Sequence, residues 1–398
     1  MYNKVSLLEN VYKLLDFEQG ELFTVEESPL ENNKWLDIGE WLESCKKINR
    51  KNENYNIEKM FFIKNNPAIV FGCCSDCNDN TIEQAFINTW CMARPRYLFL
   101  SMPGELRVYD LTQAATIVEN SVLIPEPIEI VKAAIEIIKK MQRFSRANIE
   151  SGNLEIEKEG RNQRADKTLI NDIKNIRHSL VNLGLSGHYL KYAHAIIGRS
   201  IFIRYLEDRK ILTKEYFEKI ALQHPDWQKT LDSPIEDTIL QSEKEDICYI
   251  RVLRNKEFTY ALFTELSSDF NGDMFPIDDI EKAVITDEHL IKISDFLQGK
   301  FDEQLRLFFW AYRFDVIPME LISNLYEEFY HNEIDDDKGT HYTPLSLVEF
   351  VLSQTLTSAE LENNPKILDP CCGSGIFIVE AFKRIVRYNI IKNSGERL

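Results

Sequence analysis

Between residues 59 and 111 the hydrophobic pattern predicts strands on either side of a helix. KMFFIKNNPAIVFG, at 59–72, is rich in strand-forming residues around an Asn-Asn-Pro turn. TIEQAFINTW, at 81–90, has helical spacing, and RYLFLSMPGELRVYDL, at 96–111, holds two short strands about a Pro-Gly turn. We therefore expect a small α/β module within residues 1–120.

A metal-dependent nuclease of the P-D…(D/E)-x-K kind needs carboxylates and a lysine that converge on a metal ion. The strands expected in this module carry no such pair. The strings Asp172 with Lys174 and Asp208 with Lys210 have the D-x-K spacing, but they fall in helical patterns, where we interpret them as surface charges. The module is at most a degenerate nuclease.

After residue 120 the period becomes helical, and residues 121–330 are predicted to form a helical connector domain. Its first helix is expected to start near Pro127. The charged, glycine-containing stretch 150–167 is interpreted as a link, and FNGDMFP at 270–276 as a turn. The apolar stripe predicted for the first helix consists of Ile130, Val131, Ala134, Ile137, Ile138 and Met141.

GRSIFIRYLEDRKIL, at 198–212, predicts an amphipathic helix with Ile201, Tyr205 and Leu212 on its apolar side. We interpret its charged residues as an exposed face, on which Arg204 and Asp208 pair at i,i+4.

Length, apolar runs and net charge exclude several classes of protein. The chain of 398 residues is long enough for several domains, and no apolar run is long enough to span a bilayer, so we expect a cytoplasmic protein without membrane contact. A net charge of -17 argues against indiscriminate coating of nucleic acid. Residues 139–210, however, hold fifteen Lys and Arg against eight Asp and Glu. That stretch is either a DNA-contacting face or a solvated helical linker.

Eight cysteines without framework spacing favour reduced thiols. Cys74 and Cys77 form a lone C-x-x-C, with Cys73 and Cys91 nearby, but a structural zinc site usually shows two such knuckles. Thiols are therefore favoured over zinc, and no metal site is predicted.

PKILDPCCGSGIFIVEAFKR, at 365–384, predicts a strand at 366–369, a tight loop at 370–375 and a helix at 376–387. The inward residues of the helix would be Phe377, Ala381, Phe382 and Ile385. Gly373 and Gly375 would let the backbone approach a ligand, and Asp369 would accept hydrogen bonds from it. The spacing matches neither a dinucleotide fingerprint nor a triphosphate loop.

KGTHYTPLSLVEFVL, at 338–352, predicts a second helix start. Thr343 suits the N-cap and Pro344 the first turn, and the apolar face would hold Leu347, Val348, Val351 and Leu352. Free N–H groups at such an end attract a small anion such as a carboxylate. Each of the two segments alone could be only a capped helix start or a turn, whereas the two together, about 30 residues apart and in this order, are a much more specific sign of a functional site.

The pair DPCCGSGIF and GTHYTP resembles the adenine-specific DNA methyltransferases, in which the two segments frame S-adenosylmethionine. RSIFIRYLEDRKIL, FNGDMFP and IPMELISNLYEEFY extend the resemblance over about residues 190–387, to the large methylases of restriction-modification systems, including fused types. The resemblance implies double-stranded DNA as partner and a Rossmann-like methyltransferase domain from residue 331 to 398. The implied cofactor-binding residues are Tyr342, Thr343, Pro344, Asp369, Cys371, Gly373 and Gly375.

One part of the family pattern is missing from these residues. The family holds its target amine with an (Asn/Asp/Ser)-Pro-Pro-aromatic tetrapeptide, and the thirteen prolines here include no Pro-Pro pair. We therefore expect the chain to be the N-terminal part of such a methylase, inactive by itself, with catalytic residues beyond residue 398 and with apolar faces left exposed after about residue 340. The alternatives are a non-catalytic DNA-binding or accessory subunit, and a methyltransferase for small molecules or proteins.

Overall fold

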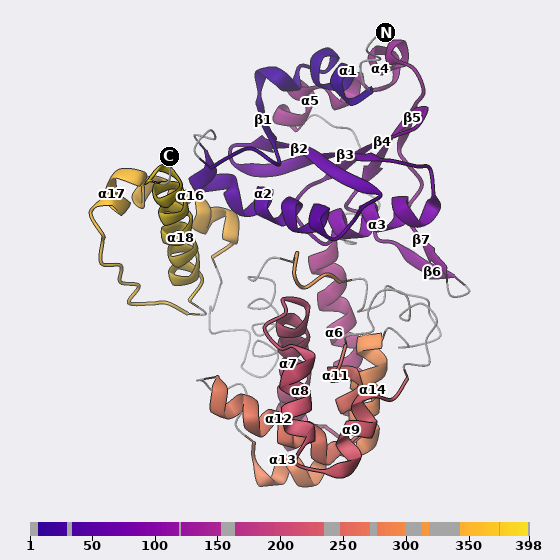
Figure 1. Ribbon diagram of the computed structural model, residues 1–398, viewed down its shortest axis with the longest axis vertical. Helices are drawn as coiled ribbons and strands as arrows, with labels where there is room; N and C mark the ends of the chain where they lie inside the picture. The colour runs from indigo at the N-terminus through magenta and orange to yellow at the C-terminus, as the bar shows by residue number, and fades with distance from the viewer. Residues whose placement is uncertain are drawn as a thin grey trace. The chain divides into compact units, whose positions relative to one another are not determined.

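The computed structural model has a mixed α/β architecture (Figure 1). It describes residues 7–29, 34–118, 121–152, 164–234, 247–270, 277–298, 312–317, 343–373 and 375–396. The chain divides into two compact units. The first comprises Met1–Gln113, Ile124–Arg164 and Asp336–Leu398, and the second comprises Ala114–Leu123 and Ala165–Asp335. The boundaries proposed above at residues 120 and 330 stay a prediction.

A six-stranded sheet in the order β1-β2-β3-β4-β5-β8 forms the centre of the first unit. Neighbouring strands are antiparallel except β3 and β4, which are parallel and are joined by the crossover helix α3 (Asp79–Trp90). The strands predicted between 59 and 111 are thus confirmed. The strands are β1 (Glu21–Thr24), β2 (Tyr55–Ile63), β3 (Asn66–Cys74), β4 (Tyr97–Met102), β5 (Glu105–Asp110) and β8 (Glu129–Val131).

Helices cover both faces of this sheet (Figure 1). On one face lie α1 (Leu7–Leu14), α4 (Ala134–Lys140) and α5 (Arg146–Ser151), and on the other lie α2 (Trp35–Arg50) and α3. Aromatic side chains fill the first interface, where the rings of Tyr12 and Phe71 meet edge to face at 5.0 Å. The helices of this face and the sheet therefore share a close-packed core.

The prediction for residues 127–141 is partly wrong. Residues Glu129–Val131 form the edge strand β8 on β5, and the helix starts only at Ala134. The edge of β5 offers Leu106, Arg107 and Val108 as pairing partners, so tertiary pairing overrides the helical pattern. Ile138 consequently lies outside the core, with 55% of its side chain exposed.

Where the structure describes the second unit, it is helical apart from the hairpin β6 (Thr116–Val118) and β7 (Ser121–Leu123). Helix α7 has buried residues on every side, as the central helix of a bundle does. The helices are α6 (Ala165–Asn182), α7 (Leu190–Asp208), α8 (Lys214–Ala221), α9 (Pro225–Leu231), α11 (Tyr249–Val252), α12 (Lys256–Asp269), α13 (Asp279–Val284) and α14 (Asp287–Gln298). The turn predicted at 271–276 lies outside the described residues.

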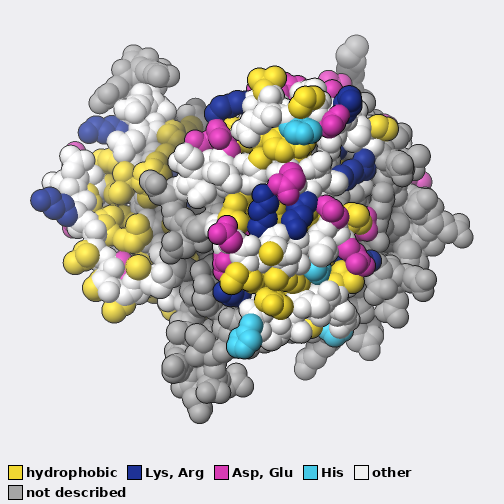
Figure 2. Space-filling model, turned by 90° about the horizontal axis from the view of Figure 1, so that it is seen from below, with side chains coloured by type: hydrophobic (Ala, Val, Ile, Leu, Met, Phe, Trp, Pro, Cys, Tyr) yellow, Lys and Arg dark blue, Asp and Glu magenta, His cyan; other side chains and the backbone are white. Residues whose placement is uncertain are grey.

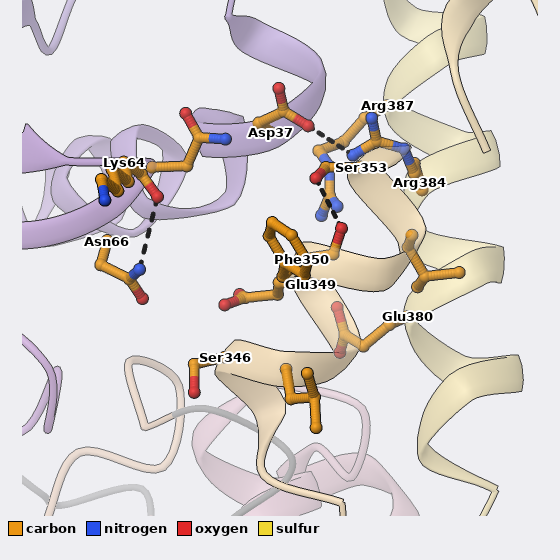
Figure 3. Close-up of a pocket in the computed structure, with 13 residues that line it drawn as sticks. Asp37, Lys64, Asn66, Ser346, Glu349, Phe350, Ser353, Glu380, Arg384 and Arg387 are labelled. Carbon is orange, nitrogen blue, oxygen red and sulfur yellow. Dashed lines mark hydrogen bonds and ion pairs between the residues drawn. The ribbon is translucent and has the colours of Figure 1, made fainter. Parts of the chain in front are cut away.

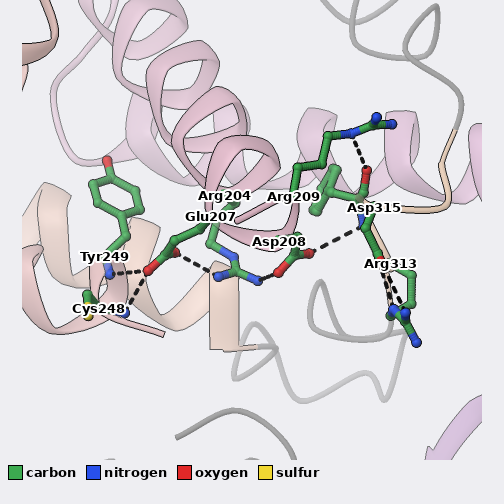
Figure 4. Close-up of polar contacts among 9 residues, drawn as sticks. Arg204, Glu207, Asp208, Arg209, Cys248, Tyr249, Arg313 and Asp315 are labelled. Carbon is green, nitrogen blue, oxygen red and sulfur yellow. Dashed lines mark hydrogen bonds and ion pairs between the residues drawn. The ribbon is translucent and has the colours of Figure 1, made fainter. Parts of the chain in front are cut away.

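Arg204 and Glu207 of α7 are buried, which corrects the exposed face predicted for the charges of this helix. Figure 4 shows the contacts of Arg204 and Glu207. Arg204 pairs with Asp208 at 2.5 Å, as predicted, and also with Glu207 at 2.7 Å. Glu207 accepts backbone N–H groups of Cys248 and Tyr249 at 2.6 and 3.0 Å. Each charge in this network has several partners, which offset part of the cost of burial, although burial still raises the pKa of Glu207.

Two further residues, interpreted from the sequence as exposed charges, are also buried. Arg199 pairs with Glu281 in the core at 2.5 Å. Asp172, interpreted from its D-x-K spacing as a surface charge, is buried and accepts the hydroxyl of Tyr312 at 2.9 Å. Neither D-x-K string therefore offers a free carboxylate at the surface. Among the helices that are described, none is long and apolar enough to cross a membrane.

Candidate functional site

The C-terminal part of the first unit consists of three helices: α16 (Leu345–Thr355), α17 (Ser358–Glu362) and α18 (Ile376–Glu396). The predicted N-cap is displaced by one residue. Pro344, with ψ at 139°, precedes the helix, and its carbonyl accepts the N–H groups of Leu347 and Val348 at 2.8 and 3.1 Å. Thr343 lies one position earlier and is partly exposed, and Tyr342 lies outside the described residues.

The glycine loop ahead of α18 has the backbone that its sequence predicts. Gly373 and Gly375 have φ values of 52° and 80°, and a Cβ on either would meet no atom within 4 Å. Asp369 Oδ1 accepts the N–H of Cys371 at 3.1 Å, and the N–H of Gly375 donates to the carbonyl of Cys372 at 2.7 Å. The loop is thus a tight turn with open space over both glycines.

The strand predicted at 366–369 is wrong. These residues have no strand assignment, and Ile367 and Leu368 expose 40% and 84% of their side chains. A strand forms only where a neighbour pairs with it, and no neighbour pairs here within the described part of the chain. The prediction that Phe382 points inward is also wrong, because 65% of its side chain is exposed.

Helices α16 and α18 nevertheless have a packed side, where they meet α2 of the N-terminal module. Leu36 of α2 is buried among side chains of the C-terminal helices. The buried members of this cluster are Leu36, Leu345, Val348, Leu352, Leu356, Leu361 and Ala381. Phe377 and Ile385 pack against it from α18, so two of the predicted inward residues are partly buried in the expected direction.

Basic side chains of α18 form hydrogen bonds and ion pairs with the first two turns of α2. Arg384 donates to Asp37 Oδ1 at 2.6 Å and to the carbonyl of Leu356 at 2.7 Å. Arg387 donates to the carbonyl of Leu36 at 3.0 Å. The residues of α18 and α2 that meet here are more than 300 positions apart in the chain.

Glu40 is the shared carboxylate of this attachment. It accepts Lys383 Nζ at 2.9 Å and Arg387 Nη1 at 3.1 Å. Although burial opposes the effect, these two cations hold the pKa of Glu40 below its usual value. The carboxylate is therefore ionised near neutral pH and ties two positions of α18 to α2.

A pocket of about 370 Å³ lies beside this attachment, between α2, α16, α18 and the turn that joins β2 to β3 (Figure 3). Figure 3 shows the carboxylate of Glu349 projecting from α16 toward the β2–β3 turn. Loop residues 369–375 are not among those that line the pocket. The C-terminal segment thus holds two distinct features, an open glycine loop and a polar pocket.

Three arginines of the predicted basic stretch 139–210 have partners within the protein, whereas residues 153–163 of the stretch, with Arg161, lie outside the described residues. Arg143 donates to the carbonyl of Ile128 at 2.8 Å, Arg146 pairs with Asp16 at 2.8 Å, and the Arg164 guanidinium donates to backbone carbonyls. On the face shown in Figure 2, Lys and Arg side chains lie beside Asp and Glu side chains. DNA contact through this stretch stays a prediction.

The cysteines around the C-x-x-C pair differ in their surroundings: Cys74 and Cys91 are buried, Cys73 is partly buried and Cys77 is exposed. No three His, Cys, Asp or Glu side chains of the described residues converge as metal ligands would.

Residues 319–395 match the family model of N-6 DNA methylases. The matched segment includes α16, the glycine loop and nearly all of α18, and it supports an adenine DNA methyltransferase family for this part of the chain. DNA is the substrate that this family implies. No curated protein and no solved structure matches the chain.

Sequence reasoning missed the role of α2. WLDIGEWLESCKKINR, at 35–50, has helical spacing, and its acidic residues Asp37 and Glu40 lie one turn apart. That signal would have revealed a helix with an acidic face. It would not have revealed the partner, because nothing local connects this face to basic residues in α18.

Proposed function

We propose that residues 343–375 form part of an S-adenosylmethionine site, and that the parent activity is methyl transfer to the exocyclic N6 amine of adenine in DNA. The observation that carries the proposal is the family match over a loop whose two glycines are left-handed and open on their Cα side. A side chain at either position would occupy the space that a cofactor needs. The residues present therefore fit the group.

Each predicted residue has a role in this proposal. Gly373 and Gly375 let the backbone approach the cofactor, and Asp369 and Cys371 shape the turn through their mutual hydrogen bond. Thr343, Pro344 and Tyr342 would lie at the methionine end, where an α16 N-terminus favours a carboxylate. When bound, S-adenosylmethionine supplies an electrophilic methyl group, and the protein supplies binding and orientation.

We further propose that residues 1–398 alone transfer no methyl group. The amine of adenine is a weak nucleophile because its lone pair is conjugated with the ring, and the family activates it with a Pro-Pro-aromatic tetrapeptide that this sequence does not contain. The restriction-modification or phage-defence setting is part of the proposal and rests on the sequence resemblance. A purely accessory DNA-binding role has less support, because Arg143, Arg146 and Arg164 of the basic stretch form hydrogen bonds or ion pairs within the protein.

Equilibrium dialysis with labelled S-adenosylmethionine tests the loop. Gly373→Val should weaken binding by at least about tenfold, because a branched side chain fills the open space and disfavours the left-handed backbone. Gly152→Val is the matched control, since Gly152 also has a left-handed φ of 70° with no atom within 4 Å of its Cβ position. It carries the same backbone strain away from the loop.

Equal affinity in the wild type and Gly373→Val would remove the loop from the site, and a loss shared by Gly152→Val would assign the effect to strain. The same labelled cofactor, incubated with DNA, tests the second statement. Incorporation of label above background would contradict the requirement for the tetrapeptide.

A further inference from the structure

The pocket beside the α2 attachment is nearly neutral. Most charged side chains at the floor of the pocket form ion pairs: Asp37 pairs with Arg384, and Glu380 pairs with Lys383 at 2.8 Å. Arg387 is likewise paired with Glu40. Strongly charged ligands of either sign therefore find no uncompensated partner at the floor, and a neutral ligand with donors and acceptors suits it better.

One face of α16 lines this pocket. Ser346, Glu349, Phe350 and Ser353 recur at helical spacing on that face, whereas Leu345 and Val348 face the apolar cluster and Leu352 borders both. Phe350 exposes 62% of its side chain at the rim. A large exposed aromatic ring in a pocket wall is a surface for a flat ring to stack on.

The carboxylate of Glu349 enters the pocket without a hydrogen bond or ion pair of its own among the described residues. On the opposite side, the β2–β3 turn presents Lys64 and the amides of Asn65 and Asn66. A pocket of about 370 Å³ is in the range of small-molecule sites, and polar groups on two walls would fix the orientation of a ligand.

We propose that this pocket binds a nucleobase, with Phe350 against the flat ring and Glu349 at the hydrogen-bonding edge. A protonated carboxyl donates one hydrogen bond and accepts another, which matches the ring nitrogen and amino group of cytosine or adenine. The base comes either from a free nucleoside or from a nucleic acid. This site is separate from the glycine loop and does not depend on methyl transfer.

The surroundings of Glu349 favour its protonated form. Burial raises the pKa of Glu349 to about 7, Glu380 and Glu40 add to this effect, and Arg94 and Arg387 oppose it. Asp37, Lys64 and Arg384 are the other charged groups that line the pocket. Between about pH 6 and about pH 8 the protonated fraction falls by about tenfold, so binding of cytosine should weaken by the same factor.

Equilibrium dialysis with labelled cytidine, on the full chain, tests the proposal. Cytidine is chosen because an adenosine probe would also suit the glycine loop. Glu349→Ala should lose about tenfold in affinity at about pH 6, whereas Glu349→Gln, whose amide also donates and accepts, should stay within about threefold of wild type. Glu349→Gln should also abolish the pH dependence. Phe350→Tyr should retain binding and Phe350→Ala should lose it.

Circular dichroism confirms that each variant is folded, and Gly373→Val should bind cytidine as the wild type does. A short oligocytidylate distinguishes the two sources. If it binds more tightly than cytidine, the base that occupies the pocket belongs to a nucleic acid, and if it binds equally, the base belongs to a free nucleoside. Absence of saturable cytidine binding at about pH 6, or equal binding by Glu349→Ala, overturns the proposal. Tighter binding at the higher pH would also overturn it, because the carboxylate form would then be the one that binds.

Discussion

Two arginine networks organise this protein in different ways. In the helical unit, Arg204 binds Glu207 and Asp208 within a turn of its own helix, and these side chains are buried or nearly so. In the first unit, Arg384 and Arg387 reach from α18 to α2, more than 300 residues earlier in the chain. The first network stabilises the inside of a bundle, whereas the second joins the methylase-like segment to an α/β module.

The difference lies in how the charges are compensated. Arg204 is kept charged because Asp208 and Glu207 raise its pKa against the opposing effect of burial. The carboxylates of α2 are more exposed, at 25% for Asp37 and 39% for Glu40, so solvent screens their charges. A fully buried network is costly to break, and a partly exposed one is weaker and is screened by salt.

The largest expected effect is in the helical unit. Arg204→Met leaves Glu207 buried without its ion-pair partner and should lower the free energy of unfolding by about 3–5 kcal/mol. Urea unfolding, followed by hydrogen exchange of peptides from α7, measures the loss. Lys282→Met is the control, since its pair with Glu257 is exposed and should contribute less than about 1 kcal/mol. Equal losses in the two variants would contradict the contrast.

A smaller effect is expected at Glu40. Glu40→Gln should lower the protection of α18 by about 1 kcal/mol near neutral pH, because the side chain is partly screened by solvent. The lowered pKa means that this contribution is present above the usual glutamate pKa and is lost as the pH falls through the lowered value. The difference between variant and wild type should therefore vanish in acid.

Glu43→Gln is the matched control on the same helix. Its pair with Lys46 lies within α2, so it should leave the protection of α18 unchanged. A difference between Glu40→Gln and wild type that persists in strong acid would mean that the carboxylate charge does not hold α18.

The same contrast explains how far the sequence could predict the structure. Arg204 and Asp208 are four residues apart, so their pairing follows from helical spacing alone. Their burial does not, because α7 is surrounded by helices whose packing no local pattern reveals. The strands between 59 and 111 were predictable because they pair with near neighbours, whereas β8 depends on an edge that only the folded sheet provides.

The candidate site shows the same limit. The left-handed glycines at 373 and 375 were predictable because the loop geometry requires glycine there. The strand at 366–369 was not a safe prediction, since four apolar and polar residues become a strand only beside a partner. The pocket was not predictable at all, because its walls come from α2, a β-turn and two C-terminal helices.

The central claim is that α2 holds the methylase-like segment through its pairing with α18, and a double-mutant cycle between Asp37 and Arg384 tests it most directly. Hydrogen exchange of α18 amides is measured in wild type, Asp37→Ala, Arg384→Ala and the double variant. Because Asp37 accepts from Arg384 at 2.6 Å, the cycle should give a coupling free energy of about 1–3 kcal/mol. The claim would be contradicted if the losses of the two single variants simply add in the double variant. It would also be contradicted if Asp37→Ala leaves α18 as well protected as in the wild type.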